Sequence, residues 1–223
     1  MSSTLRKSFW LMAGLVAALV VLAAGHDLYW RRKVAVYRAE LKARGEQFEI
    51  EELIEHFPPE VYQAASELHR AAGRSPGAFI QPYAMRLIAP GKAMVGHTRT
   101  NIWAPGGDTT NTWEEVDAQV EQLRPALALA REKLRAERIV ARLDYSQGFN
   151  ILLPHLAQMK SLAQRFSCTA MDDLHHDDFP SALTNLLAGI RILGTIDGEH
   201  LMISELVRIA ISSIMFSATW EAM

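Results

Sequence analysis

The sequence predicts a mainly α-helical protein: an N-terminal transmembrane helix with a stalk, an irregular Pro/Gly-rich segment, and then antiparallel helical hairpins. Three observations predict this class. An uncharged apolar run covers residues 9–25, Pro and Gly crowd residues 74–111, and from residue 112 onward apolar side chains recur at helical intervals of three and four. We expect a membrane anchor with an amphipathic stalk helix (1–45), a short helix plus the irregular segment (46–111), and a helical hairpin domain (112–223), complete or cut short at its C-terminus.

The composition excludes several classes of protein. Of the 223 residues, 49% are hydrophobic and 22% are charged, as in a folded chain, and the formal net charge of -2 gives no general attraction to nucleic acid. Cys168 is alone, so no intrachain disulfide can form, and its helical neighbours favour a buried structural thiol. The sequence holds no Walker loop, no G-x-G-x-x-G, no G-x-S-x-G and no C-x-x-C. We therefore expect no cofactor and no enzymatic activity.

The N-terminal apolar run predicts a single membrane span. As a helix, residues 9–25 cover about 26 Å, and aromatic residues beyond both ends extend this toward the two membrane interfaces. A cleaved signal peptide is the alternative, with a small-residue site at Ala23–Gly25. The basic residues Arg31–Lys33 favour an uncleaved anchor, and the side of the membrane that the remaining chain faces stays open. The expected anchor residues are Phe9, Trp10, Leu15, Leu19, Leu22, Tyr29 and Trp30.

The apolar spacing continues beyond the span. Trp30, Val34, Tyr37 and Leu41 form one stripe, which predicts an amphipathic stalk helix, and Gly45 is placed to end it. Pro59 is expected to open a further helix that ends at Gly73. Its apolar stripe is Val61, Ala65, Leu68 and Ala72.

Residues 74–111 predict an extended chain that lies over the helical body, with one short strand or helical turn. The alternative is a flexible tether. Many large apolar side chains favour the packed chain: Phe79, Ile80, Tyr83, Met85, Leu87, Ile88, Ile102 and Trp103.

The next helix is expected to begin at Thr112, because Thr112 and Glu115 have the spacing of a capping box. Val116, Val120, Leu123 and Leu127 mark its apolar face. Pro125 lacks an N–H, so we expect a kink or a break near Leu123.

Three helices then follow with short turns between them, which implies antiparallel neighbours. Pro154 opens the first, and the turn HHDD at residues 175–178 ends it. The expected stripes are Leu156, Met159, Ala163, Phe166, Ala170 and Leu174 in the first helix; Leu183, Leu186, Leu187, Ile190 and Leu193 in the second; and Ile203, Leu206, Val207, Ala210 and Ile214 in the third.

Residues 154–223 resemble tetratricopeptide-type helical repeats. The resemblance lies in Ala170, in the tight turn that ends at Asp178, and in Ala182 one turn into the next helix. The usual turn glycine and the Trp and Gly-Tyr signature are missing, as is a second copy at the repeat spacing. The whole layout is similar to that of bacterial membrane-anchored proteins, which implies the bacterial inner membrane but does not indicate any particular activity.

The stretch DDLHHDDFPSAL (172–183) raises the question of a metal site. We expect a turn, with Asp177 or His176 in the left-handed conformation and Asp178 capping the next helix through the Ser181 N–H. Helix length places His175 and His176 about 28 Å from His155 and His200. We therefore expect no metal site, and the weak candidates for one are His155, Asp197, Glu199 and His200.

The sequence thus favours a membrane-anchored, non-catalytic interaction or scaffold module that binds the bilayer through its N-terminal helix and an unidentified protein partner elsewhere. Nucleic acid is not expected as a partner, and the oligomeric state stays open. The alternatives are a metal-dependent hydrolase that uses His155 and His200, and a fragment of a larger helical domain that continues beyond Met223. The last helix is apolar on all faces, so it needs cover or a partner. The expected interaction surface is Ile209, Met215, Phe216 and Trp220.

Overall fold

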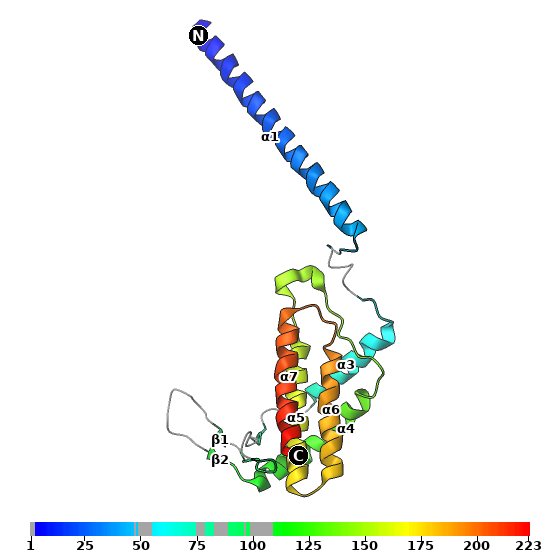
Figure 1. Cartoon of the computed structure of the whole chain (residues 1–223). Helices are drawn as coiled ribbons and strands as arrows, with labels where there is room; N and C mark the ends of the chain where they lie inside the picture. Colours follow the sequence, from blue (N-terminus) through cyan, green and yellow to red (C-terminus); the bar gives the residue numbers. More distant parts are fainter. Residues whose placement is uncertain are drawn as a thin grey trace. The chain divides into compact units, whose positions relative to one another are not determined.

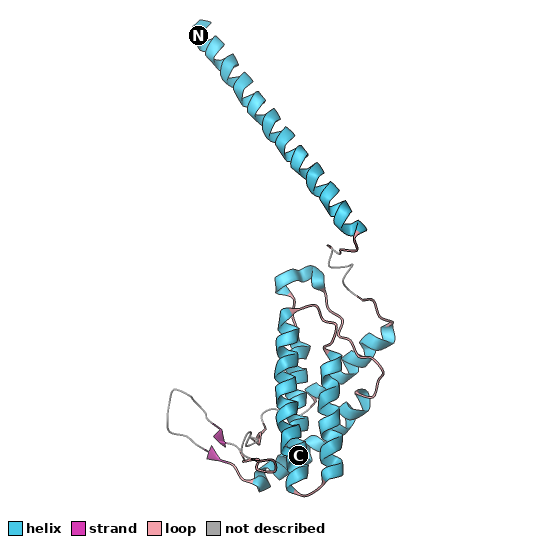
Figure 2. Cartoon of the chain, in the orientation of Figure 1, coloured by secondary structure: helices cyan, strands magenta, loops and turns pink. Residues whose placement is uncertain are grey.

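The computed structural model describes residues 3–46, 48, 55–74, 79–82, 89–95, 97–98 and 109–223, with the backbone alone at positions 3–13, 15, 16, 97, 98, 109, 110 and 149. The chain separates into two compact units, Met1–Glu55 and His56–Met223, which are described in turn (Figure 1). Helices dominate the described residues, as Figure 2 shows, so the predicted mainly helical class is confirmed.

The N-terminal unit is built on one continuous helix, α1 (Ser3–Ala43), whose 41 residues extend about 60 Å, twice the thickness of a bilayer core. The predicted end at Gly45 is confirmed. Gly45 has a φ of 90°, its N–H donates to the Lys42 carbonyl (3.0 Å), and the Glu46 N–H donates to the Leu41 carbonyl (3.1 Å). This is a Schellman cap, which needs a residue that tolerates positive φ.

The described side chains of the predicted anchor are exposed: Leu19, Leu22, Tyr29 and Trp30. Phe9, Trp10 and Leu15 lie outside the described side chains. Among the residues whose side chains the structure describes, the C-terminal helix α7 (Met202–Glu221) is long and apolar enough to cross a membrane, with a mean hydropathy of 1.4. Within this described part, composition thus identifies a candidate span at the opposite end of the chain from the predicted one.

The second unit begins with α3 (Pro59–Gly73), which opens at Pro59 and ends at Gly73 as predicted. The buried face of α3 consists of Ala65, Leu68, Ala71 and Ala72, and this helix packs on α4 and α5. Residues from His56 onward thus belong to the same compact unit as the later helices.

Helix α4 (Trp113–Lys133) begins with the predicted capping box. The Glu115 N–H donates to the Thr112 hydroxyl (3.3 Å), and the Thr112 N–H donates to the Glu115 carboxylate (2.9 Å). Of the kink or break expected near Leu123, the break is wrong, because α4 runs through Pro125 without interruption, and the kink stays a prediction. Pro in a helix interior costs about 3 kcal/mol. Here Leu123 and Leu127 are each 1% exposed, so burial on either side of the proline holds the helix together.

Helix α5 (Pro154–His175) is the centre of the unit and contacts α3, α4, α6 (Phe179–Arg191) and α7. The 3-10 turn η1 (Tyr145–Asn150) precedes α5, and η2 (Ile192–Thr195) links α6 to α7. Figure 1 shows α5, α6 and α7 running side by side. The predicted trio of antiparallel helices is therefore present in this part of the chain.

The turn between α5 and α6 forms as predicted. Asp177 has a φ of 59°, which is left-handed, and its N–H donates to the Leu174 carbonyl (3.1 Å). The Asp178 N–H donates to the Asp173 carbonyl (2.8 Å), and the Asp178 carboxylate accepts from the Ser181 N–H (3.2 Å). One aspartate therefore replaces the usual turn glycine, and the next caps α6.

The described part of the irregular segment packs on the helices, as predicted. The Ile80 N–H donates to Gln119 Oε1 (2.6 Å), and the Cys168 thiol donates to the Ile80 carbonyl (3.2 Å). Strand β1 (His97–Thr98) pairs antiparallel with β2 (Thr109–Thr110). The side chains packed around Val116, Val120 and Cys168 are Phe79, Ile80, Val95 and Trp113. The predicted core residues Tyr83, Met85, Leu87, Ile88, Ile102 and Trp103 lie outside the described residues.

Helix α6 turns a different face to the core than its apolar pattern predicts. Of the expected stripe on α6, Leu186 is buried, whereas Leu183, Leu187 and Ile190 are 42–57% exposed. Besides Asn185 and Leu186, the inward face carries the small residues Ala182, Ala188 and Gly189. A Cβ at Gly189 would clash with the Met215 methyl group of α7. Close helix packing therefore selects the small face over the large apolar one.

Helix α7 also corrects two predictions. The expected core residues Ile203 and Leu206 are 49% and 56% exposed, while Met215, expected at an interaction surface, is only 2% exposed and packs against α6. Ile209 and Phe216 are exposed, as expected. Trp220 is half-buried. The buried positions of α7 instead are Ser204, Ile211, Met215, Ser217, Ala218 and Glu221.

Two phenylalanines provide a test of this core. Phe166 of α5 is fully buried and Phe216 of α7 is 70% exposed. We expect Phe166→Ala to lower the free energy of unfolding by about 3–5 kcal/mol, because it leaves a cavity, and Phe216→Ala to change it by less than about 0.5 kcal/mol. Denaturant titration of both variants, followed by far-ultraviolet circular dichroism, measures this. Equal losses would show that α7 faces the other way.

Candidate functional site

The predicted polar set at the start of α5 is only partly brought together. His155 Nε2 lies 2.8 Å from Glu199 Oε1, with His155 5% and Glu199 4% exposed. Asp197 instead pairs with Arg208 on the surface (2.9 Å), and His200 is exposed. The set of four candidates thus divides into one buried pair and two surface residues.

Two residues that the sequence did not indicate complete the buried pair. The Ser204 hydroxyl of α7 donates to Glu199 Oε2, and the His69 ring of α3 lies 5.4 Å from the His155 ring, between centroids. Burial and the neighbouring His155 lower the pKa of His69 to about 4, so this imidazole is neutral at neutral pH. No motif marks His69 or Ser204, because their elements meet only in the folded unit.

The chemistry available to this buried network is limited. Ser204 donates its proton to a carboxylate and not to an imidazole, so the arrangement lacks the activated hydroxyl of a nucleophilic triad. His155 Nε2 and Glu199 Oε1 form a hydrogen bond within the unit. We interpret the network as a structural connection between α3, α5 and the start of α7.

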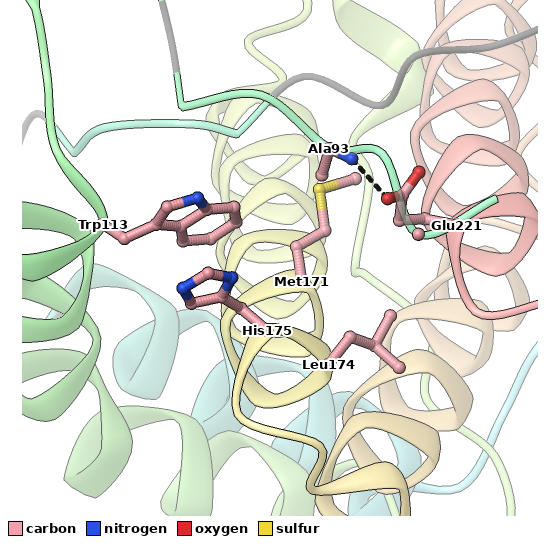
Figure 3. Close-up of a pocket in the computed structure, with 7 residues that line it drawn as sticks. Ala93, Trp113, Met171, Leu174, His175 and Glu221 are labelled. Carbon is pink, nitrogen blue, oxygen red and sulfur yellow. Dashed lines mark hydrogen bonds between the residues drawn. The ribbon is translucent and has the colours of Figure 1, made fainter. Parts of the chain in front are cut away.

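A small pocket lies at the other end of α5 (Figure 3). Trp113 stacks on His175 with ring centroids 4.0 Å apart. Glu221 accepts from the Ala93 N–H through its carboxylate and from the Gly91 N–H through its carbonyl. The pocket volume is about 70 Å³, far below the roughly 300–1,000 Å³ of cofactor sites, so it can hold water and not an organic cofactor. The lining residues are Gly91, Ala93, Trp113, Met171, Leu174, His175 and Glu221.

An acidic cluster lies beside the pocket. Asp117 of α4 and both Asp172 and His176 at the end of α5 offer ligand atoms that all lie within 4.8 Å of one another. Burial and the nearby Asp117 raise the pKa of Asp172 to about 6. A hydrogen bond to the Asp172 carbonyl raises the pKa of His176 above its usual value. Among the described residues, Asp117, Asp172 and His176 are the set in which three possible metal ligands converge. The side chains around His155 do not form such a set.

The carboxylate of Asp173, the buried acid next to Asp172, has hydrogen-bonding partners. Asp173 accepts from Arg124 Nη1 (3.1 Å) and from the Asn185 amide (2.7 Å), and Arg131 in turn donates to Asn185 (2.8 Å). Burial still raises the pKa of Asp173, although these hydrogen bonds act to lower it.

The expected buried thiol is also confirmed: Cys168 is 1% exposed, and burial raises its pKa to about 12, which makes it unreactive.

Comparison with known proteins gives no match: no family model, no curated protein and no solved structure resembles this chain significantly. The tetratricopeptide-like character expected for residues 154–223 therefore stays a prediction. The functional proposal therefore rests on the geometry of this chain.

The buried network predicts a contrast between two acids that were both candidate site residues. Glu199→Ala leaves His155 and Ser204 buried without their shared partner, so we expect a loss of at least about 2 kcal/mol in the free energy of unfolding. Asp197→Ala removes an exposed ion pair and is expected to cost less than about 1 kcal/mol. Urea titration at pH 7 compares them. If Glu199→Ala were as harmless as Asp197→Ala, the network would have no structural role.

Proposed function

We propose that the protein is a membrane-anchored, non-catalytic helical module that binds a protein partner. The observation that carries this proposal is the group of large apolar side chains left exposed on α6 and α7, two helices that contact each other; these side chains are here called the α6–α7 face. Monomeric soluble proteins rarely leave a large apolar surface exposed, so many exposed apolar side chains on neighbouring helices support a contact surface. The side chains that form it are 42–83% exposed: Phe179, Leu183, Leu187 and Ile190 of α6, and Met202, Ile203, Leu206, Ile209 and Phe216 of α7.

The chemistry of the α6–α7 face favours a protein over a lipid surface. Helices that lie in a membrane interface carry many Lys and Arg beside their apolar face. Here α6 and α7 contribute only Arg191 and Arg208, and Arg208 is paired with Asp197 and Glu205. Two adjacent apolar helices suit an apolar helix of a partner, which packs along them.

We assign the membrane anchor to α1 and not to α7. Apart from the half-buried Leu41, the described apolar side chains of α1 are exposed, including Leu19, Leu22 and Val34, so a bilayer would supply the cover that they lack. Helix α7 meets the requirement of composition, but Ile211, Met215 and Ala218 are buried against the rest of its unit. A single-pass anchor at α1 keeps α7 within the fold.

The assignment of the anchor can be tested by introducing charge into each helix. An arginine at the centre of a span costs about 2.5–3.5 kcal/mol. We expect the double variant Leu19→Arg, Leu22→Arg to be released from membranes by alkaline carbonate, because it places two charges in the proposed span. The matched variant Ile209→Arg, Phe216→Arg in α7 is expected to stay in the membrane pellet. The opposite pattern would identify α7 as the span.

Binding through the α6–α7 face can be tested by site-specific photo-crosslinking of the full chain in its native membranes. A photoreactive benzoylphenylalanine at Leu187 is expected to give one discrete adduct with a protein. The same probe at Leu152, which is 81% exposed outside this face, is expected to give none. Adding Leu183→Glu should abolish the Leu187 adduct, because it places a charge in the apolar contact.

Three results would contradict this proposal. Equal adducts from Leu152 and Leu187 would show unspecific collision, and adducts with lipid alone would make the face a membrane contact. An adduct of twice the chain's own mass would show that the α6–α7 face binds a second copy of the chain and not a separate partner.

A further inference from the structure

Asp172 is a buried acid whose carboxylate lacks a hydrogen bond. Its side chain is 1% exposed, and neither carboxylate oxygen has a hydrogen-bonding partner. The Arg124 guanidinium faces Asp172, but it binds Asp173 (3.1 Å) and Glu121 (2.6 Å), and its Nη2 stays 3.7 Å from Asp172 Oδ2. A buried carboxylate without adequate partners costs several kcal/mol. The position therefore favours an additional cation.

The two other side chains of the cluster are arranged to supply the remaining ligands. The His176 Nδ1–H donates to the Asp172 carbonyl (2.9 Å), since a carbonyl can only accept. This fixes the tautomer and leaves Nε2 as the free ligand atom, an arrangement typical of metal-binding histidines. That Nε2 lies 3.5 Å from Asp117 Oδ2. Two ligands at about 2.1 Å from a tetrahedral metal are about 3.4 Å apart.

We propose that Asp117, Asp172 and His176 bind a divalent transition-metal ion of the zinc type. One imidazole and two carboxylates suit such an ion better than Mg²⁺ or Ca²⁺, which favour oxygen ligands alone. The side chains of His176 and Asp117 are 50% and 45% exposed, so the ion can enter from solvent and keep a water ligand on that side. The charge of Arg124 opposes the ion, which favours moderate affinity.

The role of this ion is structural in the first instance. It joins the second turn of α4 to the last turn of α5, two segments far apart in the sequence. The stacked pair Trp113 and His175 lies on the same two helix ends. The inference is independent of the partner and of the anchor proposed above.

The test uses the full chain in detergent, treated with a chelator and then dialysed, with ZnCl₂ as the probe at pH 7.5. Isothermal titration should give one zinc ion per chain, and zinc should raise the melting temperature, because the ion binds the folded state. We expect Asp117→Asn and His176→Gln each to weaken zinc binding about tenfold or more. Both side chains are half-exposed, so the variants should retain their helical circular dichroism.

Asp177→Asn is the matched control. It removes the same charge from an exposed position on the same turn, and Asn tolerates the left-handed φ of 59° there. Zinc binding by this variant should match that of the parent chain. The proposal is overturned if the full chain binds no zinc at about 100 μM. It is equally overturned if Asp177→Asn weakens binding as much as Asp117→Asn, or if Mg²⁺ binds as tightly as Zn²⁺.

Discussion

The burial of the second half of α5 on every side is the constraint on which the rest of the unit depends. From Phe166 to Asp173 each residue of this helix is buried, beneath α3, α4, α6, α7 and the segment around Ile80. Polar groups in such a stretch cannot reach bulk water, so each needs a partner from another element. The Cys168 thiol reaches the Ile80 carbonyl and Asp173 reaches Arg124, while Asp172 keeps an unsatisfied carboxylate.

The demand for close cover around α5 also shapes the outer surface. Helices α6 and α7 approach each other closely because Gly189 gives room to Met215. Apart from Asn185 and Leu186, small side chains therefore face inward on α6, and large ones such as Leu183 and Leu187 remain outside. The exposed apolar face is thus a consequence of how the core is packed, and it leaves α6 and α7 with surface that favours a further contact.

Local signals predicted helix ends well and helix faces poorly. The capping box at Thr112, the glycine cap at Gly45 and the left-handed Asp177 are each decided within about five residues, so the sequence alone indicates them. The face of α6 depends on what lies opposite, because this helix is apolar around most of its circumference. The acidic cluster was missed for the same reason: Asp117 lies far from Asp172 and His176 along the chain, and only the packing of α4 on α5 brings them together.

Membrane spanning shows the same limit of sequence reasoning. Hydropathy measures what a helix contains and not what surrounds it, so α7 qualifies as a span although Ile211 and Ala218 are fully buried in a protein core. Withdrawing α7 into a bilayer would cost its packing on α5 and uncover the side chains beneath it, at about 1.5–3 kcal/mol for each large side chain. The described side chains of α1, such as Leu22, are exposed, so its insertion disrupts no packing at those positions. The balance of these two costs supports the proposal that α1, and not α7, is the membrane anchor.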